Sequence, residues 1–445
     1  MVVWSEVDLG ELAGDRRLDA EYYEPSMLRF DQAVKSFPAG WKTLREMAEL
    51  ITDGDHLKRD YQDEGVLFLT AESFSEHRID YHSPLRISPT YERTLARARS
   101  EAGAVFLTKT GRWYGKAAVC VRDTPIFNIP ADVAKIRLRP EFDPSFLACY
   151  LNAPIGYALV RREASGASRD RIVLENLRAL PVPIVTGQDA FRHIVVLIDQ
   201  AYQEADRLYA EAESTLKKAL GLDRLDLAPR LFFEGASQDV MNAGRFDAEY
   251  SSPRSQNLIA ALKQGGMTLE DVAPLANRPF RAQPDVPFNY IEIGDIQPGG
   301  TAVAQRIEGR DAPSRAQWIV QPGDIVTATV RPIRRLSAII PDNQAGYVCS
   351  SGFAVLEPTK VEPEVLLTFL RLPLVCELLD LHTTASMYPA ISTTDLLRLP
   401  IGLPPPGDRE AIVARVQESL RAKREGSRLL KEARELVERA VLGDA

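Results

Sequence analysis

Clusters of metal-ligating residues are missing from this chain of 445 residues. The four cysteines are widely separated, and no pair of them has the spacing of metal ligands. They are Cys120, Cys149, Cys349 and Cys376. The five histidines are too few and too dispersed for a zinc site. We therefore expect no metal and no cofactor, and we expect the cysteines to be buried thiols in a reducing compartment.

Long apolar runs are missing as well. No stretch reaches the roughly 18 apolar residues that indicate a transmembrane helix. The opening residues, MVVWSE, contain no basic segment followed by an apolar run, which is the pattern of a secretory signal. These observations predict a cytoplasmic protein without a membrane partner.

Catalytic motifs are the third absence. No glycine-rich loop of the phosphate-binding type precedes a helical pattern. Residues 404–406 are three prolines, but they lack the flanking residues of the Asn/Asp-Pro-Pro-Tyr motif used in DNA methylation. Glu357 and Lys360, near Asp342, do not have the Glu-x-Lys spacing of a nuclease strand. We predict that the protein is not an enzyme. The alternative is a nuclease or methyltransferase with an unrecognised active site.

Positive charge is in the minority. The chain has 54 Lys and Arg against 62 Asp and Glu, which gives a formal net charge of −8. Any basic surface for a nucleic-acid partner must therefore be local. The hydrophobic content of 45% is that of an ordinary soluble protein, and the length predicts about three domains of ~150 residues each.

An internal repeat organises the chain. The segment RLDAEYYEP at residues 17–25 recurs as RFDAEYSSP at residues 245–253, which is 228 positions later. Further matches follow in the same order, and the separation between the copies falls steadily to 219 residues. Small loop deletions explain such a drift. A repeat of this size indicates a duplicated domain rather than a solenoid.

Each copy is predicted to be a mixed α/β module. Apolar runs in the first copy indicate strands at residues 66–70, 103–111, 117–121 and 133–138. Asp143 followed by Pro144 is typical of a helix start, because aspartate caps helices and proline is tolerated in the first turn. Short helices at the edges of a β-rich centre are therefore expected.

Two long amphipathic helices are predicted, one after each module. Apolar side chains recur at three- and four-residue intervals over residues 188–222, until Gly221 ends the pattern, and again over residues 408–442. The narrow apolar stripes favour a coiled coil about 50 Å long, and duplication favours antiparallel packing. Packing of each helix on its own domain is the alternative. Expected surface ion pairs are Glu418/Arg421, Lys431/Glu435 and Arg434/Glu438.

The predicted fold is α+β, with two duplicated mixed α/β domains separated by two long helices that form an antiparallel coiled coil. The predicted boundaries are 1–187 and 244–407 for the domains, 188–222 and 408–445 for the helices, and 223–243 for a linker. The copies differ most in polar loops, at residues 53–61 against 277–283 and at residues 109–116 against 329–335. A shared scaffold that carries different loops in its two copies is suited to binding two different ligands of the same class.

The order of these features resembles the DNA specificity subunit of type I restriction-modification systems. The resemblance covers nearly the whole chain, and the segments that carry it are ITDGDH at 51–56, GVLFL at 65–69, LTKTG at 107–111 and the loop at 166–172 before Leu180 and Pro181. The second copy departs from it, because ANRPF at 276–280 replaces the Thr-Asp-Gly segment.

This resemblance implies a non-catalytic subunit whose two target-recognition domains read a bipartite double-stranded DNA site. It also implies that the helices are a spacer that docks DNA methyltransferase subunits, with two copies expected. Restriction or translocase subunits as further partners are left open by the sequence. Three alternatives remain open. They are a related system whose partner fuses methylation and cleavage, an unrecognised enzyme, and a coiled-coil scaffold that binds only proteins.

Basic and aromatic residues gather in the predicted loops. Arginine can bind guanine edges with two hydrogen bonds, and Lys and Arg both bind phosphates. Solvated loop charge is the alternative for any single residue, whereas DNA contact is favoured for the sets. The predicted DNA-binding residues are Lys58, Arg59, Tyr61, Lys109, Arg112, Tyr114, Lys116, Arg169 and Arg171 in the first domain, and Arg278, Arg281, Arg331, Arg334, Arg335, Ser386 and Tyr388 in the second.

Overall fold

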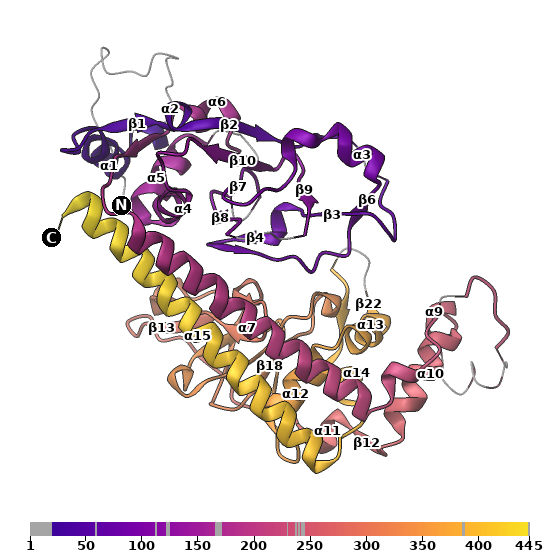
Figure 1. The fold of residues 1–445 in the computed structure, drawn as a ribbon. Helices are drawn as coiled ribbons and strands as arrows, with labels where there is room; N and C mark the ends of the chain where they lie inside the picture. Colours follow the sequence, from indigo (N-terminus) through magenta and orange to yellow (C-terminus); the bar gives the residue numbers. More distant parts are fainter. Residues whose placement is uncertain are drawn as a thin grey trace. The chain divides into compact units, whose positions relative to one another are not determined.

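The chain divides into two compact units in the computed structural model (Figure 1). Unit 1 contains Met1–Gln203 and Lys423–Ala445, and unit 2 contains Glu204–Ala422. The structure describes residues 20–57, 60–111, 114–121, 125–164, 171–228, 230–235, 238, 241, 245–384 and 388–443. Each unit therefore combines one copy of the repeat with one segment of each long helix.

Unit 1 is built around an antiparallel sheet of four strands in the order β2-β10-β7-β8. These strands are β2 (Ala48–Asp53), β10 (Val133–Leu138), β7 (Val105–Thr108) and β8 (Ala117–Val119). Beside it lie a sheet of β6 (Arg86–Ile87), β3 (Val66–Phe68) and β9 (Phe127–Asn128), and a hairpin of β4 (Phe74–Ser75) and β5 (Arg78–Ile79). The four predicted strands of the first copy are confirmed.

Short helices surround these sheets in unit 1 (Figure 1). They are α1 (Pro25–Lys35), α2 (Leu44–Met47), α3 (Pro89–Thr94), α4 (Pro144–Asn152), α5 (Pro154–Arg162) and α6 (Leu174–Ala179). The helix start predicted at Asp143 is confirmed, since its side chain accepts a hydrogen bond from the Ser145 amide at 2.7 Å. A two-stranded pair of β1 (Trp41–Thr43) and β11 (Pro181–Pro183) joins the two ends of the copy.

Unit 2 repeats this architecture. Its strands are β12 (Met267–Thr268), β13 (Phe288–Ile291), β14 (Ile296–Gln297), β15 (Thr301–Ala302), β16 (Gln305–Ile307), β17 (Ala316–Ile319), β18 (Ile325–Ala328), β19 (Ser337–Ile339), β20 (Val348–Ser350), β21 (Phe353–Leu356), β22 (Thr383–Thr384), β23 (Ala390–Ile391) and β24 (Pro400–Ile401). Its helices are α9 (Ala248–Ser251), α10 (Pro253–Lys263), α11 (Leu269–Val272), α12 (Pro363–Leu370), α13 (Pro373–Leu381) and α14 (Thr393–Leu397).

Strand pairings recur at equivalent positions in the two units. Val105 pairs with Val119 in unit 1, and Ile325 pairs with Ile339 in unit 2. β3 runs parallel to β9, as β13 does to β20. The predicted duplication is therefore confirmed in the register of the sheets.

Strand β2 of unit 1 has no full counterpart in unit 2. The segment of unit 2 that corresponds to β2 forms no strand within the fully described range 245–384, and it and its neighbour Pro279 make isolated bridges, Leu275 with Leu356 and Pro279 with Trp318. Pro274 and Pro279 lie in or beside this segment, and proline has no amide hydrogen to donate to a sheet. The difference noted in the sequence at residues 276–280 therefore has a structural counterpart.

The two long helices are α7 (Asp189–Ala219) and α15 (Pro406–Leu442), close to their predicted bounds. Gly221 follows α7 with φ of 66°, the left-handed conformation that commonly ends helices. In unit 2 their segments run antiparallel, because Glu211 contacts Arg415 at 3.1 Å while Ala205, earlier in α7, accepts a hydrogen bond from Ser419, later in α15.

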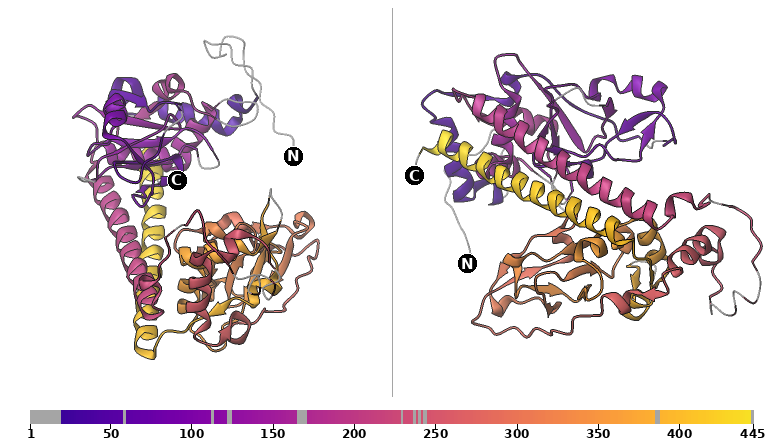
Figure 2. Two further views of the ribbon diagram at one scale, coloured as in Figure 1. Left: turned by 90° about the vertical axis from the view of Figure 1, so that its right-hand side faces the viewer. Right: turned by 60° about the horizontal axis from the view of Figure 1, so that its bottom comes forward.

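The helix segments are also part of the core of their own units, which is the alternative packing that the sequence left open. In unit 1, Ile194 and Ile198 of α7 and Ala433 and Val437 of α15 belong to one buried cluster with the sheet and α4. Figures 1 and 2 show the two segments side by side. The Tyr202 ring packs against Gly426, where an added Cβ would lie 2.9 Å from it.

One predicted ion pair on α15 is confirmed and one is wrong. Lys431 pairs with Glu435 at 3.6 Å. Arg434 pairs with Glu76 at the β4–β5 turn rather than with Glu438, and Lys116 pairs with the same carboxylate. Although burial favours the neutral acid, these two cations hold the pKa of Glu76 below its usual value. The carboxylate therefore links α15 to the sheet of unit 1.

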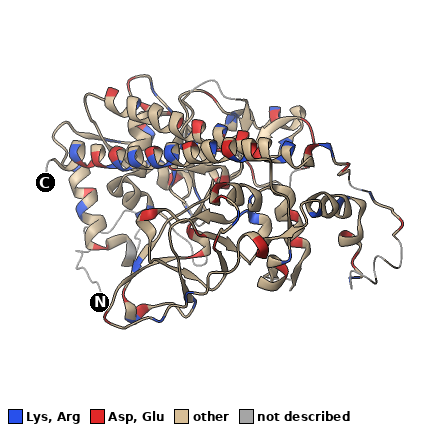
Figure 3. Cartoon of the chain, turned by 90° about the horizontal axis from the view of Figure 1, so that it is seen from below, with Lys and Arg blue, Asp and Glu red and all other residues tan. Residues whose placement is uncertain are grey.

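Charged residues of both signs are spread along the long helices (Figure 3). Arg428, for example, pairs with Glu425 at 2.7 Å and with Glu432 at 2.8 Å. None of the described helices combines the length and apolarity needed to cross a bilayer.

Candidate nucleic-acid interface

Three predicted loops of unit 1 meet at one place. They are the segment after β2, the segment after β7 and the segment before α6. Thr110 and Arg171 form an isolated antiparallel bridge, and the Ile172 amide donates to the Lys109 carbonyl at 3.0 Å. The Arg171 guanidinium lies 3.1 Å from the His56 ring nitrogen Nε2. Arg171 and His56 are both exposed, so these loops contribute polar side chains to one surface.

The corresponding loops of unit 2 meet in the same way. Val330 and Ala390 form the bridge, and the Ile391 amide donates to the Thr329 carbonyl at 2.9 Å. The bridge positions are 220 and 219 residues beyond Thr110 and Arg171, which matches the separation of the repeat. One scaffold therefore joins the same two loops in both units, although their side chains differ.

Unit 2 presents exposed cations and an aromatic ring on these loops. The Arg331 guanidinium lies 5.3 Å from the centre of the Tyr388 ring, and 66% of Tyr388 is exposed. Arg334 is exposed on the same loop and has no ion-pair partner within the described part of the chain. Arg281 is exposed on the segment before β13. These residues have the chemistry to contact phosphates and base edges.

Lys109, Tyr114 and Lys116 are predicted from the sequence to contact DNA, but all three side chains are largely buried. Lys109 is only 2% exposed, and its ammonium group pairs with Asp53. Tyr114 is 8% exposed and lies 6.5 Å from the Tyr157 ring. Lys116 is largely buried, with its charge occupied by Glu76 and its ammonium group 4.6 Å from the Tyr157 ring. Lys109 and Lys116 therefore hold this loop against the body of unit 1 through their ion pairs with Asp53 and Glu76.

Two predicted cations of unit 2 are also committed to internal partners. Arg278 pairs with the buried Asp324, and burial raises the pKa of that carboxyl although Arg278 opposes the effect. Arg335 pairs with Glu213 of α7, and its Nε donates to the Arg371 carbonyl at 2.6 Å. We assign both residues to the fold rather than to the exposed surface.

Tyr61 is 43% exposed, and its ring lies 6.0 Å from that of Phe68. The remaining predicted residues lie outside the described part of the structure. They are Lys58, Arg59, Arg112, Arg169 and Ser386. Sequence reasoning assigned no DNA contact to Ile333, which is 47% exposed between Arg331 and Arg334. Its position within a basic loop could have identified it.

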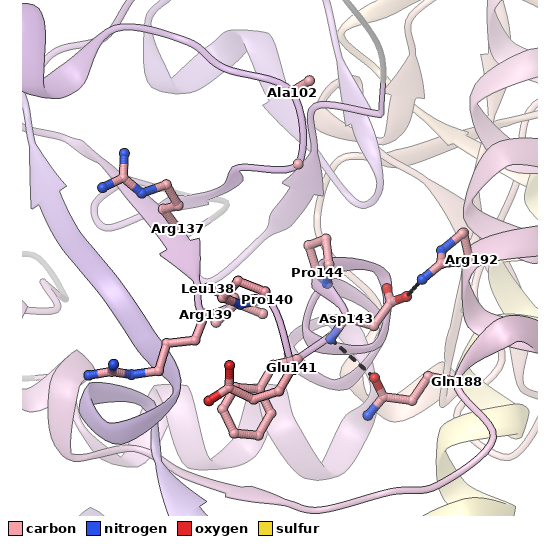
Figure 4. A pocket seen from close by; sticks show the side chains of 12 residues that line it. Ala102, Arg137, Leu138, Arg139, Pro140, Glu141, Asp143, Pro144, Gln188 and Arg192 are labelled. Carbon is pink, nitrogen blue, oxygen red and sulfur yellow. Dashed lines mark hydrogen bonds and ion pairs between the residues drawn. The ribbon is translucent and has the colours of Figure 1, made fainter.

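Two pockets of unit 1 are shallow and polar. The pocket shown in Figure 4 has a volume of about 380 Å³. Asp143 lies in it, but its carboxylate pairs with Arg192 and caps α4, and its backbone amide donates to Gln188 at 3.1 Å. Asp143 and Arg192 of this pocket therefore already serve the fold.

All four cysteines are buried, as predicted, and burial raises the pKa of the Cys376 thiol to about 11. No group of three or more His, Cys, Asp or Glu side chains in the described part of the chain could hold a metal ion.

Replacing Lys109 is expected to damage unit 1 rather than to remove a DNA contact. Lys109→Ala leaves the carboxylate of Asp53, itself 18% exposed, without its partner, which costs about 3–5 kcal/mol. The melting temperature of the full chain should fall by roughly 10 °C. The control is Lys109→Met combined with Asp53→Leu, which removes both charges and should restore most of the loss. An unchanged melting temperature with weakened DNA binding would instead identify Lys109 as a DNA contact.

Comparison with known proteins gave matches only among solved structures, since no family model and no curated protein matches the chain. One is the S subunit of a type I restriction-modification system from M. genitalium, with 11% identity and a TM-score of 0.33, covering 92% of this chain and 96% of that chain. Another is the HsdS subunit from Thermoanaerobacter tengcongensis, with 19% identity and a TM-score of 0.26, covering 92% and 98%.

A third match is the type IIG restriction endonuclease BpuSI, with 8% identity and a TM-score of 0.31. It covers 40% of this chain and 28% of that chain. The M. genitalium and T. tengcongensis proteins are S and HsdS subunits, and each of these matches spans nearly the whole of both chains. All three TM-scores lie below 0.5, and the proposals below rest on contacts within this chain.

Proposed function

We propose that the chain is a non-catalytic DNA-recognition subunit of a type I restriction-modification complex, and that each unit reads one half of a bipartite double-stranded site. The observation that carries this proposal is the repeated loop junction. Thr110 with Arg171 and Val330 with Ala390 join the same two loops at equivalent positions of a duplicated frame. Two copies of one scaffold that carry different loops are suited to recognising two different sequences on one DNA molecule.

The chemistry of the loops favours DNA as that polymer. Arg331, Arg334 and Arg281 of unit 2 and Arg171 of unit 1 are exposed although the chain as a whole is acidic. Arginine combines a permanent charge with a planar fork of donors that fits both phosphates and guanine edges. A local concentration of such residues is better explained by contact with nucleic acid than by simple exposure of charged side chains to solvent.

The outer surfaces of the long helices are the proposed docking sites for methyltransferase subunits, with one copy expected for each half of the repeat. Charged residues of both signs along the long helices (Figure 3) would make such an interface selective for a partner with a complementary charge pattern. Restriction or translocase subunits would join through the same complex. In this proposal the helices also set the distance between the two half-sites.

The isolated chain is expected to bind DNA weakly and with strong salt dependence. Four exposed arginines, counted as about four phosphate contacts, predict a log–log slope near −3.6, so raising salt from 50 to 200 mM should weaken binding roughly 100-fold. Methyltransferase subunits should tighten binding by enclosing the duplex. Fluorescence anisotropy against salt concentration measures both effects. The Arg331→Ala/Arg334→Ala variant should lower the slope by about 2.

Tight, salt-independent and sequence-specific binding by the chain alone would contradict this expectation. A scaffold that binds only proteins would give no sequence preference even with a methyltransferase subunit present. Cleavage or methyl transfer by the purified chain would favour the enzyme alternative.

A further inference from the structure

The turn between β18 and β19 in unit 2 has an unusual backbone. Its centre is a short 3-10 helix, η8 (Pro332–Arg334), and the residues on both sides of it are left-handed. Arg331 has φ of 51° and Arg335 has φ of 59°. Only one other non-glycine residue in the described part of the chain, His77, has a positive φ. Side chains with a Cβ rarely adopt this conformation, because the Cβ crowds the following carbonyl.

Several contacts hold the turn in this strained form. The Arg335 Nε donates to the Arg371 carbonyl at 2.6 Å, and Arg371 returns a hydrogen bond to the Arg335 carbonyl at 2.7 Å. Glu213 of α7 balances the charge of Arg335. On the other side, the Arg331 amide donates to the Pro389 carbonyl at 2.8 Å. Strain that the surroundings maintain in this way commonly marks a functional site.

The turn exposes an isoleucine between two cations. Pro332 is buried below, whereas 47% of Ile333 is exposed. Arg331 lies against the exposed Tyr388 ring, and Arg334 is exposed on the other side of Ile333. A single exposed isoleucine is ordinary on a protein surface. Ile333 lies at the tip of this turn between two arginines. It would therefore contact the same ligand that the arginines bind.

We propose that Ile333 reads a thymine in the major groove by contacting its C5 methyl group, while Arg331 and Arg334 bind neighbouring phosphates or a guanine edge. This inference rests on the proposed DNA-reading function and specifies it for unit 2. The C5 methyl is the apolar group that base edges offer in the major groove, so it is the natural partner of an aliphatic side chain. Unit 1 has Trp113 at the equivalent position of the repeat, outside the described residues.

The test removes that methyl group alone. The full chain, with its methyltransferase subunit, is bound to a duplex that carries its mapped recognition site. Each thymine of the half-site read by unit 2 is replaced in turn by deoxyuridine. One replacement should weaken binding about fourfold, the value expected for one buried methyl group. In Ile333→Ala the same replacement should have no effect, whereas Ile333→Val should retain most of the sensitivity.

Val303→Ala is the matched control, because Val303 is an aliphatic residue of unit 2 with similar exposure, 52%, outside these loops. It should respond to deoxyuridine as the wild-type protein does. Sequence-specific binding in which no thymine is sensitive, or in which Ile333→Ala keeps the sensitivity, would overturn the inference and leave the proposed function standing.

Insertion of Ile333 between base pairs is the competing mode of contact. It would appear as increased fluorescence of 2-aminopurine at one base step, lost in Ile333→Ala, without sensitivity to the thymine methyl. That result would also overturn methyl reading. If the complex recognised no sequence at all, the proposed function would fail first and this inference with it.

Discussion

Replacing Arg331 and Arg334 together by alanine is expected to abolish recognition of one half-site and to leave the other unchanged. Each arginine that grips a base edge or phosphate contributes about 1–3 kcal/mol, so losing both should weaken binding to that half-site roughly 100-fold or more. Both side chains are exposed in unit 2, so the fold should survive the change. The measurement is the set of sequences methylated by the complex before and after substitution.

Conservative variants sharpen this test. Arg331→Lys/Arg334→Lys keeps both charges but loses the planar fork, so phosphate binding should persist while base preference relaxes. The reciprocal change in unit 1 is Arg171→Ala with His56→Ala, which should relax only the other half-site. Equal effects of either pair on both half-sites would show that the units do not read separately. Lys109 is unsuitable for this purpose because it is buried against Asp53.

Lengthening both long helices by seven residues is expected to change the gap between the half-sites without changing the half-sites themselves. The division between the units falls after Gln203 in α7 and after Ala422 in α15, so insertions there leave each unit intact. Seven residues preserve the apolar seam and add about 10 Å at ~1.5 Å per residue. This corresponds to about three base pairs at ~3.4 Å each.

Two outcomes agree with the spacer role of the helices. The methylated motif acquires a longer gap, or binding fails because the readers are rotated relative to the duplex. An insertion of seven residues in α7 alone is the control, since it interrupts the antiparallel seam and should destabilise the chain instead. Full activity with the original gap in the doubly extended variant would show that the helices do not set the distance.

Most of the fold could be predicted because it depends on short-range patterns. Runs of apolar residues indicated the central strands, and Asp143 with Pro144 marked the start of α4. The repeat added what one copy alone could not provide, because two weak patterns in the same order reinforce each other. The missing counterpart of β2 could not be predicted in this way. Pro274 indicates the loss of a strand only if its segment is already known to align with β2.

The candidate site was predicted at the level of loops rather than of single side chains. A basic residue in a loop looks the same in the sequence whether it faces solvent or an acid elsewhere in the chain. Lys109 meets Asp53 across 56 positions, and Arg335 meets Glu213 across 122 positions. Arg434 shows the same competition, because Glu76 takes the place of its helical neighbour Glu438. Partners so distant in sequence are set by tertiary packing.

The central claim is that one chain carries two separate DNA readers, and the methylated motif tests it most directly. The full chain would be co-expressed with a methyltransferase encoded beside its gene, and the modified sites would be mapped across the host DNA. The claim predicts two short defined half-sites with a fixed gap of unread bases, of which Arg331→Ala/Arg334→Ala relaxes only one. A single uninterrupted motif, or a motif in which that variant alters both halves equally, would contradict it.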